Sequence, residues 1–354
     1  MNMTIEEHTS NLVALGKFLG QFKIDGIEKH PEFSELEDLT KEMNNKIDAS
    51  IHRNGWFTRE NIIFSLQQWS EALQFENLKE WINRYDLSDT GGKNVGIVMA
   101  GNIPLVGFHD FICTIICGHK IQIKQSSSDE LLLPLIARFL IDHNSEYRNR
   151  IEFKQGNLEN FDAVIATGSD NTARYFEYYF KGKPSIIRKN RNSIAILTGE
   201  ESRDELEALS QDIFLYYGLG CRNVSKLYVP EGYDFDEFFK AMYSWNPIIN
   251  ENKYANNYDY NKAVYLMSEY KILDNGFLML KEDKSFGSPI ATVFYETYAN
   301  SESLKQVLES NAEKLQCIVK KDPEENEVAF GKTQHPQLWD YADNVDTVEF
   351  LRQL

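Results

Sequence analysis

The stretch VGIVMAGNIPL at residues 95–105 indicates the architecture of this 354-residue chain. Residues 95–99 are apolar and rich in β-branched side chains, a pattern typical of a buried strand. A small polar turn that contains Asn102 follows that strand directly. Because the carboxyl ends of sheet strands deliver side chains into a ligand crevice, we expect Asn102 to face a ligand. Asn102 can instead cap the helix expected to begin near Phe108.

Short runs of this kind continue downstream of residue 94. Strand-like and helical runs follow one another at residues 108–117, 121–124, 129–141, 163–166 and 172–180. Strand, helix and strand at this rhythm indicate a parallel sheet, and the length of the chain favours a second lobe.

The two flanks of this region have other patterns. Residues 1–88 space their apolar side chains as a helix does, for example at Leu12, Leu15 and Leu19. A second lobe is expected from about Ser185 onward. Its strand-like runs lie at residues 193–197, 226–229 and 291–296, and a helical run lies at 301–311. The polar residues 250–261, rich in Asn and Tyr, and residues 322–327 are expected to form surface loops.

Composition narrows the class of protein. The hydrophobic content of 42% supports a globular fold, and the formal net charge of -17 argues against nucleic acid or membrane surfaces as partners. No apolar run reaches the ~18 residues of a membrane span, and four cysteines fit a reduced, cytoplasmic setting. The seven histidines lack the spacing of a metal site, so we expect no metal.

The stretch GLGC at residues 218–221 predicts a reactive thiol. Cys221 lies in a double-glycine turn between an apolar segment and the strand-like residues 224–229. Glycine adopts left-handed conformations at little steric cost, so such a turn can bring Cys221 against a bound ligand. The neighbouring Arg222 can stabilise a thiolate. A packed cysteine in a loop is the alternative.

Two further strand ends carry polar side chains. Residues 121–129 form a strand that ends in Lys124 and runs into three serines, which can cap the next helix. Residues 166–170 lead from a strand into a helix through Gly168 and Ser169, where free N–H groups favour a phosphate. An ordinary strand-to-helix turn is the alternative there. The basic cluster of Lys181, Lys183, Arg188, Lys189 and Arg191 is expected to be a solvated face.

In this order, the segments resemble the aldehyde dehydrogenase superfamily, and within it the acyl-CoA reductases of the LuxC type. The resemblance covers residues 94–354 and includes the closing residues 334–346. It implies an aldehyde-dehydrogenase-like α/β fold with a helical N-terminal segment. The implied domains are residues 1–185, with the nucleotide-binding lobe, and residues 186–325, a smaller catalytic lobe. Residues 326–354 would return to the first lobe or contact another subunit.

The same resemblance assigns roles to individual residues. Cys221 would be the acyl-accepting nucleophile, and Asn102 would donate a hydrogen bond to the oxyanion. Lys124 would bind the adenosine side of a nicotinamide cofactor, with Gly168 and Ser169 near its pyrophosphate.

Departures from the superfamily pattern bear on the reaction. Arg188 aligns with the glutamate that activates water in hydrolytic relatives, so a thiol of the CoA type is expected to be the group exchanged. Lys284 and Ser285 precede the Phe-Gly-Pro-like residues 286–289, where a cofactor-binding glutamate is usual. Ser127 replaces a ribose-binding glutamate and would not repel a 2′-phosphate, which favours NADPH, with NADH as the alternative.

The resemblance therefore predicts reduction of a fatty acyl-CoA, or of an acyl group on a carrier, to the aldehyde through a cysteine acyl-enzyme. We expect a homo-oligomer, with an acyl-activating enzyme as a partner. Three alternatives stay open: an oxidative aldehyde dehydrogenase, an acyl-phosphate reductase similar to the glutamyl phosphate reductases, and a catalytically silent scaffold.

Overall fold

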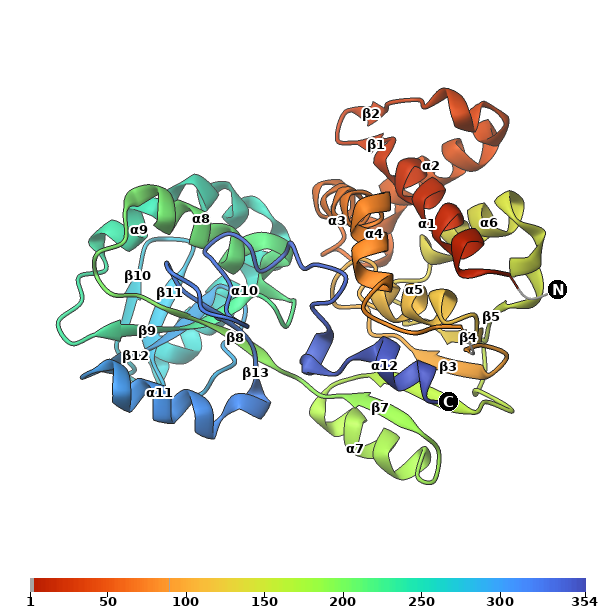
Figure 1. The fold of residues 1–354 in the computed structure, drawn as a ribbon. Coiled ribbons are helices and arrows are strands. Elements are labelled where there is room, and N and C mark those ends of the chain that lie inside the picture. The colour runs from red at the N-terminus through yellow and green to blue at the C-terminus, as the bar shows by residue number, and fades with distance from the viewer. Residues whose placement is uncertain (1–2, 89) are drawn as a thin grey trace. The chain divides into compact units, whose positions relative to one another are not determined.

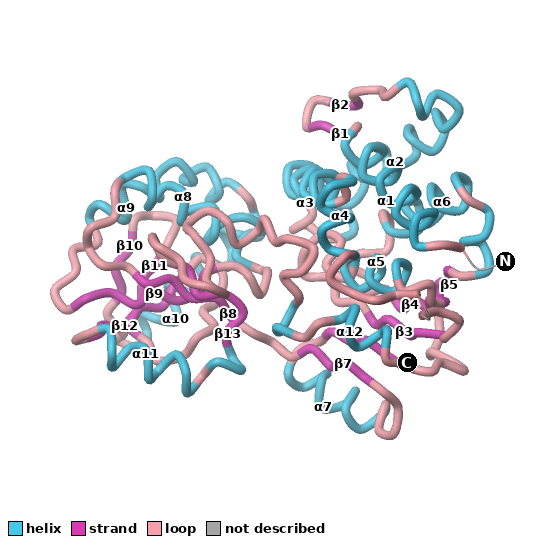
Figure 2. Tube along the Cα trace, in the orientation of Figure 1, coloured by secondary structure: helices cyan, strands magenta, loops and turns pink. Residues whose placement is uncertain are grey.

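The structure, a computed structural model, describes residues 3–88 and 90–354 and divides into two compact units. Unit 1 consists of Met1–Lys189 and Gln337–Leu354, and unit 2 consists of Asn190–Pro336. The first boundary falls after residue 189 rather than after residue 185, because the strand Ser185–Arg188 pairs with the sheet of unit 1. Figure 2 shows a set of strands in each unit.

Unit 1 is built on a parallel sheet with the strand order β5-β4-β3-β6-β7. Its strands are β3 (Asn94–Val98), β4 (Lys120–Lys124), β5 (Ile151–Phe153), β6 (Ala163–Thr167) and β7 (Ser185–Arg188). The helices between them are α5 (Phe108–Ile116), α6 (Leu133–His143) and α7 (Asp170–Tyr179). Figure 1 shows α5 on one side of this sheet and α7 on the other. The parallel sheet predicted from the strand and helix rhythm is confirmed.

Helices dominate the N-terminal part of unit 1, as predicted. They are α1 (Ile5–Gly20), α2 (Glu37–Arg53), α3 (Arg59–Ala72) and α4 (Phe75–Ile82), with a short strand pair, β1 (Phe22–Lys23) and β2 (Gly26–Ile27). The apolar stripe of α1 is fully buried at Leu12, Leu15 and Leu19. Phe18 stacks on Phe139 of α6 with ring centroids 4.5 Å apart. These helices therefore share one core with the sheet.

The C-terminal residues of unit 1 are tied to β7 by Arg188. Its side chain is only 5% exposed, and Nη2 donates to Asp110 Oδ1 at 2.6 Å and to Thr347 Oγ1 at 2.9 Å. Nη1 donates to the Ala342 carbonyl at 2.6 Å, just before α12 (Thr347–Arg352), which packs on α5. The expectation of a solvated basic face is therefore wrong for Arg188, because buried acceptors surround its guanidinium.

Unit 2 contains a second sheet with the order β10-β11-β12-β9-β8-β13. Its strands are β8 (Asn192–Ile196), β9 (Val224–Pro230), β10 (Ile272–Asp274), β11 (Met279–Glu282), β12 (Thr292–Tyr298) and β13 (Leu315–Val319). Neighbouring strands are parallel except β10 and β11. The helices are α8 (Arg203–Phe214), α9 (Asp236–Met242), α10 (Asn252–Met267) and α11 (Ser301–Ser310). Figure 1 shows α8 and α9 on the side of the sheet opposite to α11.

The predicted surface loop at residues 250–261 is wrong, because these residues lie largely in α10. Tyr254, Tyr258 and Tyr265 are buried on one face of that helix. They recur at helical spacing, so tyrosine rings supply the apolar stripe that aliphatic residues usually form. The predicted loop at residues 322–327 is confirmed.

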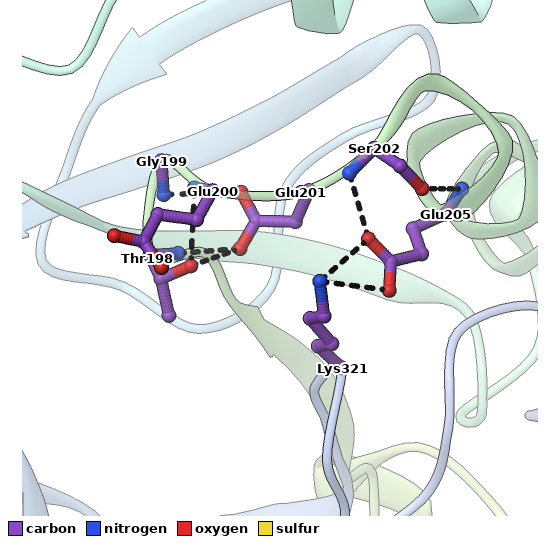
Figure 3. A network of polar contacts seen from close by, with 7 residues as sticks. All are labelled: Thr198, Gly199, Glu200, Glu201, Ser202, Glu205 and Lys321. Atoms are coloured by element: carbon purple, nitrogen blue, oxygen red, sulfur yellow. Dashed lines mark hydrogen bonds and ion pairs between the residues drawn. The ribbon is translucent and has the colours of Figure 1, made fainter.

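A polar network fixes the start of α8 (Figure 3). The Thr198 N–H and hydroxyl donate to Glu201 at 2.6 and 2.7 Å. Ser202 and Glu205 form a capping box at the helix N-terminus. Lys321 pairs with Glu205 at 3.1 Å, which ties the segment after β13 to α8. The opposite end of this helix leads into the Cys221 turn.

Candidate active site

The Asn102 loop of unit 1 is held by its neighbours. Asn102 is exposed at the carboxyl end of β3. The N-cap of α5 is Gly107, so Asn102 does not cap that helix. The Asn54 amide donates to the Gly101 carbonyl at 3.3 Å. The structure thus leaves Asn102 at a strand end in a loop anchored from the N-terminal helices.

Leu105 ends this loop in a left-handed conformation with φ 58°. Its N–H donates to Asp129 Oδ2 at 2.8 Å. Burial raises the pKa of Asp129 to about 6, against the effect of that hydrogen bond. A β-carbon on Gly101 would lie 2.6 Å from Ser126 Oγ, so the glycine permits close contact between the two loops. The loops after β3 and β4 therefore form one packed surface.

The three serines do not cap a helix. α6 begins at Leu133 with Leu132 as its N-cap, so the expected helix from residue 129 starts too early. Instead, the Ser128 N–H donates to Ser126 Oγ at 3.3 Å, and the Asp129 N–H donates to the Ser126 carbonyl at 3.0 Å. The serines are used to fold a turn against the Asn102 loop.

A cleft of about 770 Å³ opens beside the ends of β4 and β5. It is lined by Lys124 and Ser127, the two residues predicted to bind the adenosine side of a cofactor. Arg53, Glu130 and Lys154 also line it. Three cations, one carboxylate and a hydroxyl make a fitting environment for the adenosine and phosphate groups of a dinucleotide. Sequence patterns missed Arg53 and Lys154, because neither follows a recognisable motif.

Gly168 and Ser169 lie at the junction of β6 and α7. The Thr172 N–H donates to Ser169 Oγ at 3.4 Å, so Ser169 is the N-cap. A β-carbon on Gly168 would lie 3.0 Å from the Thr172 side chain, so the glycine permits close packing of the first helical turn. Neither residue lines the cleft that contains Lys124 and Ser127.

The Cys221 turn of unit 2 has an unusual backbone. Tyr216 and Tyr217 both adopt left-handed conformations, with φ 52° and 58°, and Gly218 follows with φ 75°. A left-handed residue other than glycine is disfavoured by roughly 1–2 kcal/mol. Of the two glycines in the motif, only Gly218 has a positive φ. The reversal therefore begins earlier than the glycines suggested.

Asn223 holds this turn together. Its side chain is buried, and Nδ2 donates to the carbonyls of Asp212 at 3.0 Å and Leu215 at 2.8 Å. Its Oδ1 accepts the Gly220 N–H at 2.8 Å, and its own N–H donates to the Gly220 carbonyl at 3.0 Å. Sequence reasoning did not single out Asn223, although a short amide two residues after the thiol is a usable signal for such a turn.

Cys221 itself is half-buried. Ser193 Oγ donates to the Cys221 carbonyl at 2.9 Å and accepts the Cys317 N–H at 3.1 Å. The Arg222 guanidinium donates to Cys317 Sγ at 3.5 Å. The cysteine predicted to be reactive is thus a partly exposed residue, whereas Cys113, Cys117 and Cys317 are buried.

Residues 286–289 lie next to this turn within unit 2. Ser225 Oγ donates to the Phe286 carbonyl at 2.8 Å, and Lys226 Nζ donates to the Lys284 carbonyl at 3.0 Å. A cavity of about 20 Å³ is lined by Gly218, Ser225 and Pro289, among other residues. The structure therefore brings the Cys221 turn and the Phe-Gly-Pro-like segment close together.

Asp212 connects the end of α8 to a distant loop. Its carboxylate is buried and accepts the N–H groups of Gly331 at 2.6 Å and Thr333 at 3.0 Å, and the Thr333 hydroxyl at 2.8 Å. Burial raises the pKa of Asp212 to about 6, although these hydrogen bonds act to lower it. The carbonyl of the same residue accepts the Asn223 amide, so one network supports both the loop and the turn.

Comparison with solved structures shows the fold. The indole-3-acetaldehyde dehydrogenase AldA of P. syringae, solved as a mutant in complex with NAD+ and IAA, is 12% identical with a TM-score of 0.59, and the match covers 92% of this chain and 74% of that one. Aldehyde dehydrogenase 21 of Physcomitrella patens, solved with succinate, is 14% identical with a TM-score of 0.59, and the match covers 99% of this chain and 89% of that one. The predicted aldehyde-dehydrogenase-like α/β fold is confirmed.

A curated relative is the long-chain acyl-protein thioester reductase of Aliivibrio fischeri, which is 24% identical over 230 residues. That match covers 58% of this chain and 47% of the relative, so the chain spans about half of the relative's length. The family model described as acyl-CoA reductase (LuxC) matches residues 28–284. The match begins within the N-terminal helices, earlier than the predicted residue 94, and ends before residues 334–346. Because it covers well over half of the chain, this protein belongs to the acyl-CoA reductase (LuxC) family.

Proposed function

We propose that this protein reduces an acyl thioester to the aldehyde, with Cys221 as the residue that carries the acyl group. The partly exposed residue Cys221 in a strained turn anchored by Asn223 carries this proposal. Backbone strain of this kind persists only where surrounding contacts enforce it, and it is concentrated at functional sites. Membership of the acyl-CoA reductase (LuxC) family gives the same reaction class.

The reaction begins at the Cys221 sulfur. The thiolate attacks the carbonyl carbon of the thioester and forms a carbon–sulfur bond. The Cys221 N–H is proposed to donate a hydrogen bond to the resulting oxyanion, and the Asn102 amide of unit 1 is proposed as the second donor; one such donor is typically worth about 3 kcal/mol. The bond to the thiol of CoA then breaks, and that sulfur leaves and takes up a proton. An acyl-enzyme on Cys221 remains.

A nicotinamide cofactor, when bound, supplies the hydride that reduces the acyl group. Lys124 and Ser127 would hold its adenosine side in the cleft of unit 1, and Gly168 and Ser169 are proposed to lie near its pyrophosphate. The same two proposed donors, the Cys221 N–H and the Asn102 amide, would stabilise the thiohemiacetal oxyanion, as they would the oxyanion formed in the attack on the thioester. When the carbon–sulfur bond breaks, the aldehyde leaves and the Cys221 thiolate is restored.

Arg188 favours exchange with a thiol rather than with water. The residue aligned with the water-activating glutamate is a buried cation that pairs with Asp110 at 2.6 Å. A guanidinium cannot remove a proton from water, because it stays protonated in proteins. The acyl-enzyme therefore persists until it meets a thiol or a hydride.

The acyl donor is proposed to be a long-chain acyl-CoA or an acyl group held by a protein. The name of the Aliivibrio fischeri relative, long-chain acyl-protein thioester reductase, supports both the long chain and the second donor. Ser127 in the cleft supports NADPH, with NADH as the alternative. None of the helices in residues 3–88 and 90–354 combines the length and apolar character needed to cross a membrane. The homo-oligomer and the acyl-activating partner stay predictions.

Intact-protein mass spectrometry after mixing with long-chain acyl-CoA, without cofactor, tests the central step. We expect one acyl adduct per chain that hydroxylamine removes. Cys221→Ser should form no adduct, whereas Cys317→Ser, which removes the buried thiol beside Arg222, should form it normally.

Other results would favour other functions. An unmodified wild-type protein that reacts with an acyl phosphate would favour an acyl-phosphate reductase. A requirement for free CoA together with NADP+ reduction would favour the oxidative direction. Slow alkylation of Cys221 by iodoacetamide, with no nicotinamide binding, would favour a silent scaffold.

A further inference from the structure

The cleft beside β4 and β5 has a charge pattern that sequence motifs did not reveal. It is lined by three cations, Arg53, Lys124 and Lys154, and by the carboxylate of Glu130. In a chain with a formal net charge of -17, such a gathering of cations indicates a site for anionic groups. The proposed function places the adenosine side of a nicotinamide cofactor here.

The three cations differ in how they are paired. Lys154 is 21% exposed and pairs with Glu152 at 2.7 Å, and Glu152 does not line the cleft. Within residues 3–88 and 90–354, Lys124 makes no ion pair. Arg53 pairs through Nη2 with Glu130, the carboxylate that lines the cleft. The paired arginine and the carboxylate therefore face the same space.

Arg53 comes from outside the nucleotide-binding sheet. It is the last residue of α2, and its partner Glu130 lies 77 residues later, in the loop between β4 and α6. The Arg53 side chain is 56% exposed, and that of Glu130 is 34% exposed. Ion pairs with this exposure contribute little stability, so the guanidinium is held loosely and can move toward a stronger anion.

We propose that Arg53 binds the 2′-phosphate of NADPH and makes this chain prefer NADPH to NADH. This inference rests on the proposed function, because it assigns the cleft to the cofactor's adenosine side. A guanidinium has five N–H donors, and the pair with Glu130 uses Nη2, so donors remain for a phosphate. While Arg53 Nη2 stays paired with Glu130, that carboxylate is less available to the ribose hydroxyls.

A matched ion pair in the same unit serves as a control. Arg138 of α6 pairs with Glu42 of α2 at 2.9 Å, and its side chain is 49% exposed. It likewise links α2 to the segment that follows β4, and the exposure of the two arginines is similar. Arg138 does not line the cleft, so Arg138→Gln removes an equal charge without touching the site.

The test compares two adenosine ligands that differ by one phosphate, 2′,5′-ADP and 5′-AMP, by isothermal titration calorimetry on the full chain. We expect wild type to bind 2′,5′-ADP at least about tenfold more tightly, as one charge-assisted contact implies. Arg53→Gln should bring that ratio close to one and leave 5′-AMP affinity unchanged. Arg138→Gln and Lys154→Gln should keep the wild-type ratio, and Glu130→Gln should keep or raise it.

The results separate this inference from the proposed reaction. The assignment of Arg53 would be overturned if Arg53→Gln kept the wild-type ratio of 2′,5′-ADP to 5′-AMP affinity. It would also be overturned if Arg138→Gln or Lys154→Gln lowered that ratio as much as Arg53→Gln does. A loss of 5′-AMP affinity in Glu130→Gln would show that the carboxylate binds the ribose, which also overturns it. If the ratios behave as expected while Cys221 forms no acyl adduct, the proposed reaction fails and the phosphate assignment stands. Failure of wild type to bind either ligand would overturn both the assignment and the proposed cofactor site.

Discussion

The loop after β3 in unit 1 and the turn before β9 in unit 2 each place bulky residues in left-handed conformations, but they are held in different ways. In unit 1, Leu105 alone is left-handed, and three separate side chains each make one hydrogen bond to the loop: Asp129 accepts the Leu105 N–H, Asn54 donates to the Gly101 carbonyl and Ser65 donates to the Pro104 carbonyl. In unit 2, Tyr216 and Tyr217 are left-handed in succession, and three side-chain hydrogen bonds of Asn223 cross the turn.

This difference in backbone strain and hydrogen bonding fits the function proposed for each region. A cofactor can be bound by a cleft whose cations adjust, as Arg53 and Lys124 can. A nucleophile must meet a carbonyl carbon at a defined distance and angle, because small errors in position cost rate steeply. The chain therefore concentrates strain and buried hydrogen bonds around Cys221 and leaves the cleft polar and open.

Replacing the nucleophile should have the largest effect. For Cys221→Ser we expect aldehyde formation to fall by about 10⁴-fold or more, because a hydroxyl of high pKa replaces the thiolate. Binding of 5′-AMP to unit 1 should not change. Turnover is measured by cofactor oxidation with long-chain acyl-CoA, and substantial residual turnover would remove Cys221 from the mechanism.

Loosening the turn should have the next largest effect. Asn223→Ala leaves buried donors and acceptors without partners, so we expect a loss of at least about 2 kcal/mol in the free energy of unfolding. We also expect acylation of Cys221 to slow by about 10²-fold, because the thiol is no longer held in place. Denaturant unfolding measures the change in stability, and mass spectrometry of samples quenched at successive times measures the rate of acylation.

Asn256→Ala is the control for that experiment, because Asn256 is exposed on α10. It should change neither quantity. If Asn223→Ala lost stability but reacted at the wild-type rate, the strained turn would be structural only, and the contrast between the two regions would disappear.

Asp129 and Asp212 allow a comparison by pH. Burial raises both pKa values from 3.8 to about 6. Each folded carboxyl therefore binds its proton more tightly than the same group does in the unfolded chain. Its contribution to stability falls as the pH rises from 3.8 to about 6. Relative to Asp129→Asn or Asp212→Asn, wild type should gain up to about 3 kcal/mol between about pH 7 and about pH 4.

The two variants should differ near neutral pH. Asn at position 129 can still accept the Leu105 N–H, so Asp129→Asn should cost little. Asp212 accepts three donors, and an amide would direct its own N–H₂ at one of them, so Asp212→Asn should be clearly destabilising. Equal costs in urea unfolding at neutral pH would contradict the ranking of the two regions.

The smallest expected effect concerns the cofactor. Ser127→Glu places a carboxylate in the cleft, so we expect the KM for NADPH to rise by about tenfold relative to that for NADH. Ser127→Gln, of equal size and without charge, should change the ratio less. A preference of wild type for NADH in the same assay would reverse the prediction from Ser127.

Several parts of this fold could be predicted from local patterns. The strand at residues 95–99 and the strand that ends in Lys124 are present within one residue as β3 and β4. β3 is continuously apolar over residues 95–98, as expected of a strand buried on both sheet faces, whereas in β4 the two isoleucines alternate with polar residues. α10 was missed because tyrosines, rather than aliphatic residues, form its buried face.

The candidate site divides in the same way. Cys221, Lys124 and Ser127 follow strands or glycine turns, and their positions could be anticipated. Asn223 and Arg53 could not be identified, because their importance lies in hydrogen bonds and ion pairs with groups that no local pattern specifies. Arg188 was expected at the surface, because a run of cations in the sequence gives no sign that one of them pairs with the buried Asp110.

The amino-acid sequence by itself determined the order of motifs, the parallel sheets and the membership of the acyl-CoA reductase (LuxC) family, because periodicity and turn chemistry act over a few residues. Only the tertiary structure decided which polar groups meet. Arg53 and Glu130 are 77 residues apart, and Asp212 and Thr333 are 121 residues apart. Contacts at such separations depend on how whole elements pack, and they are what give the cleft its charge and the Cys221 turn its rigidity.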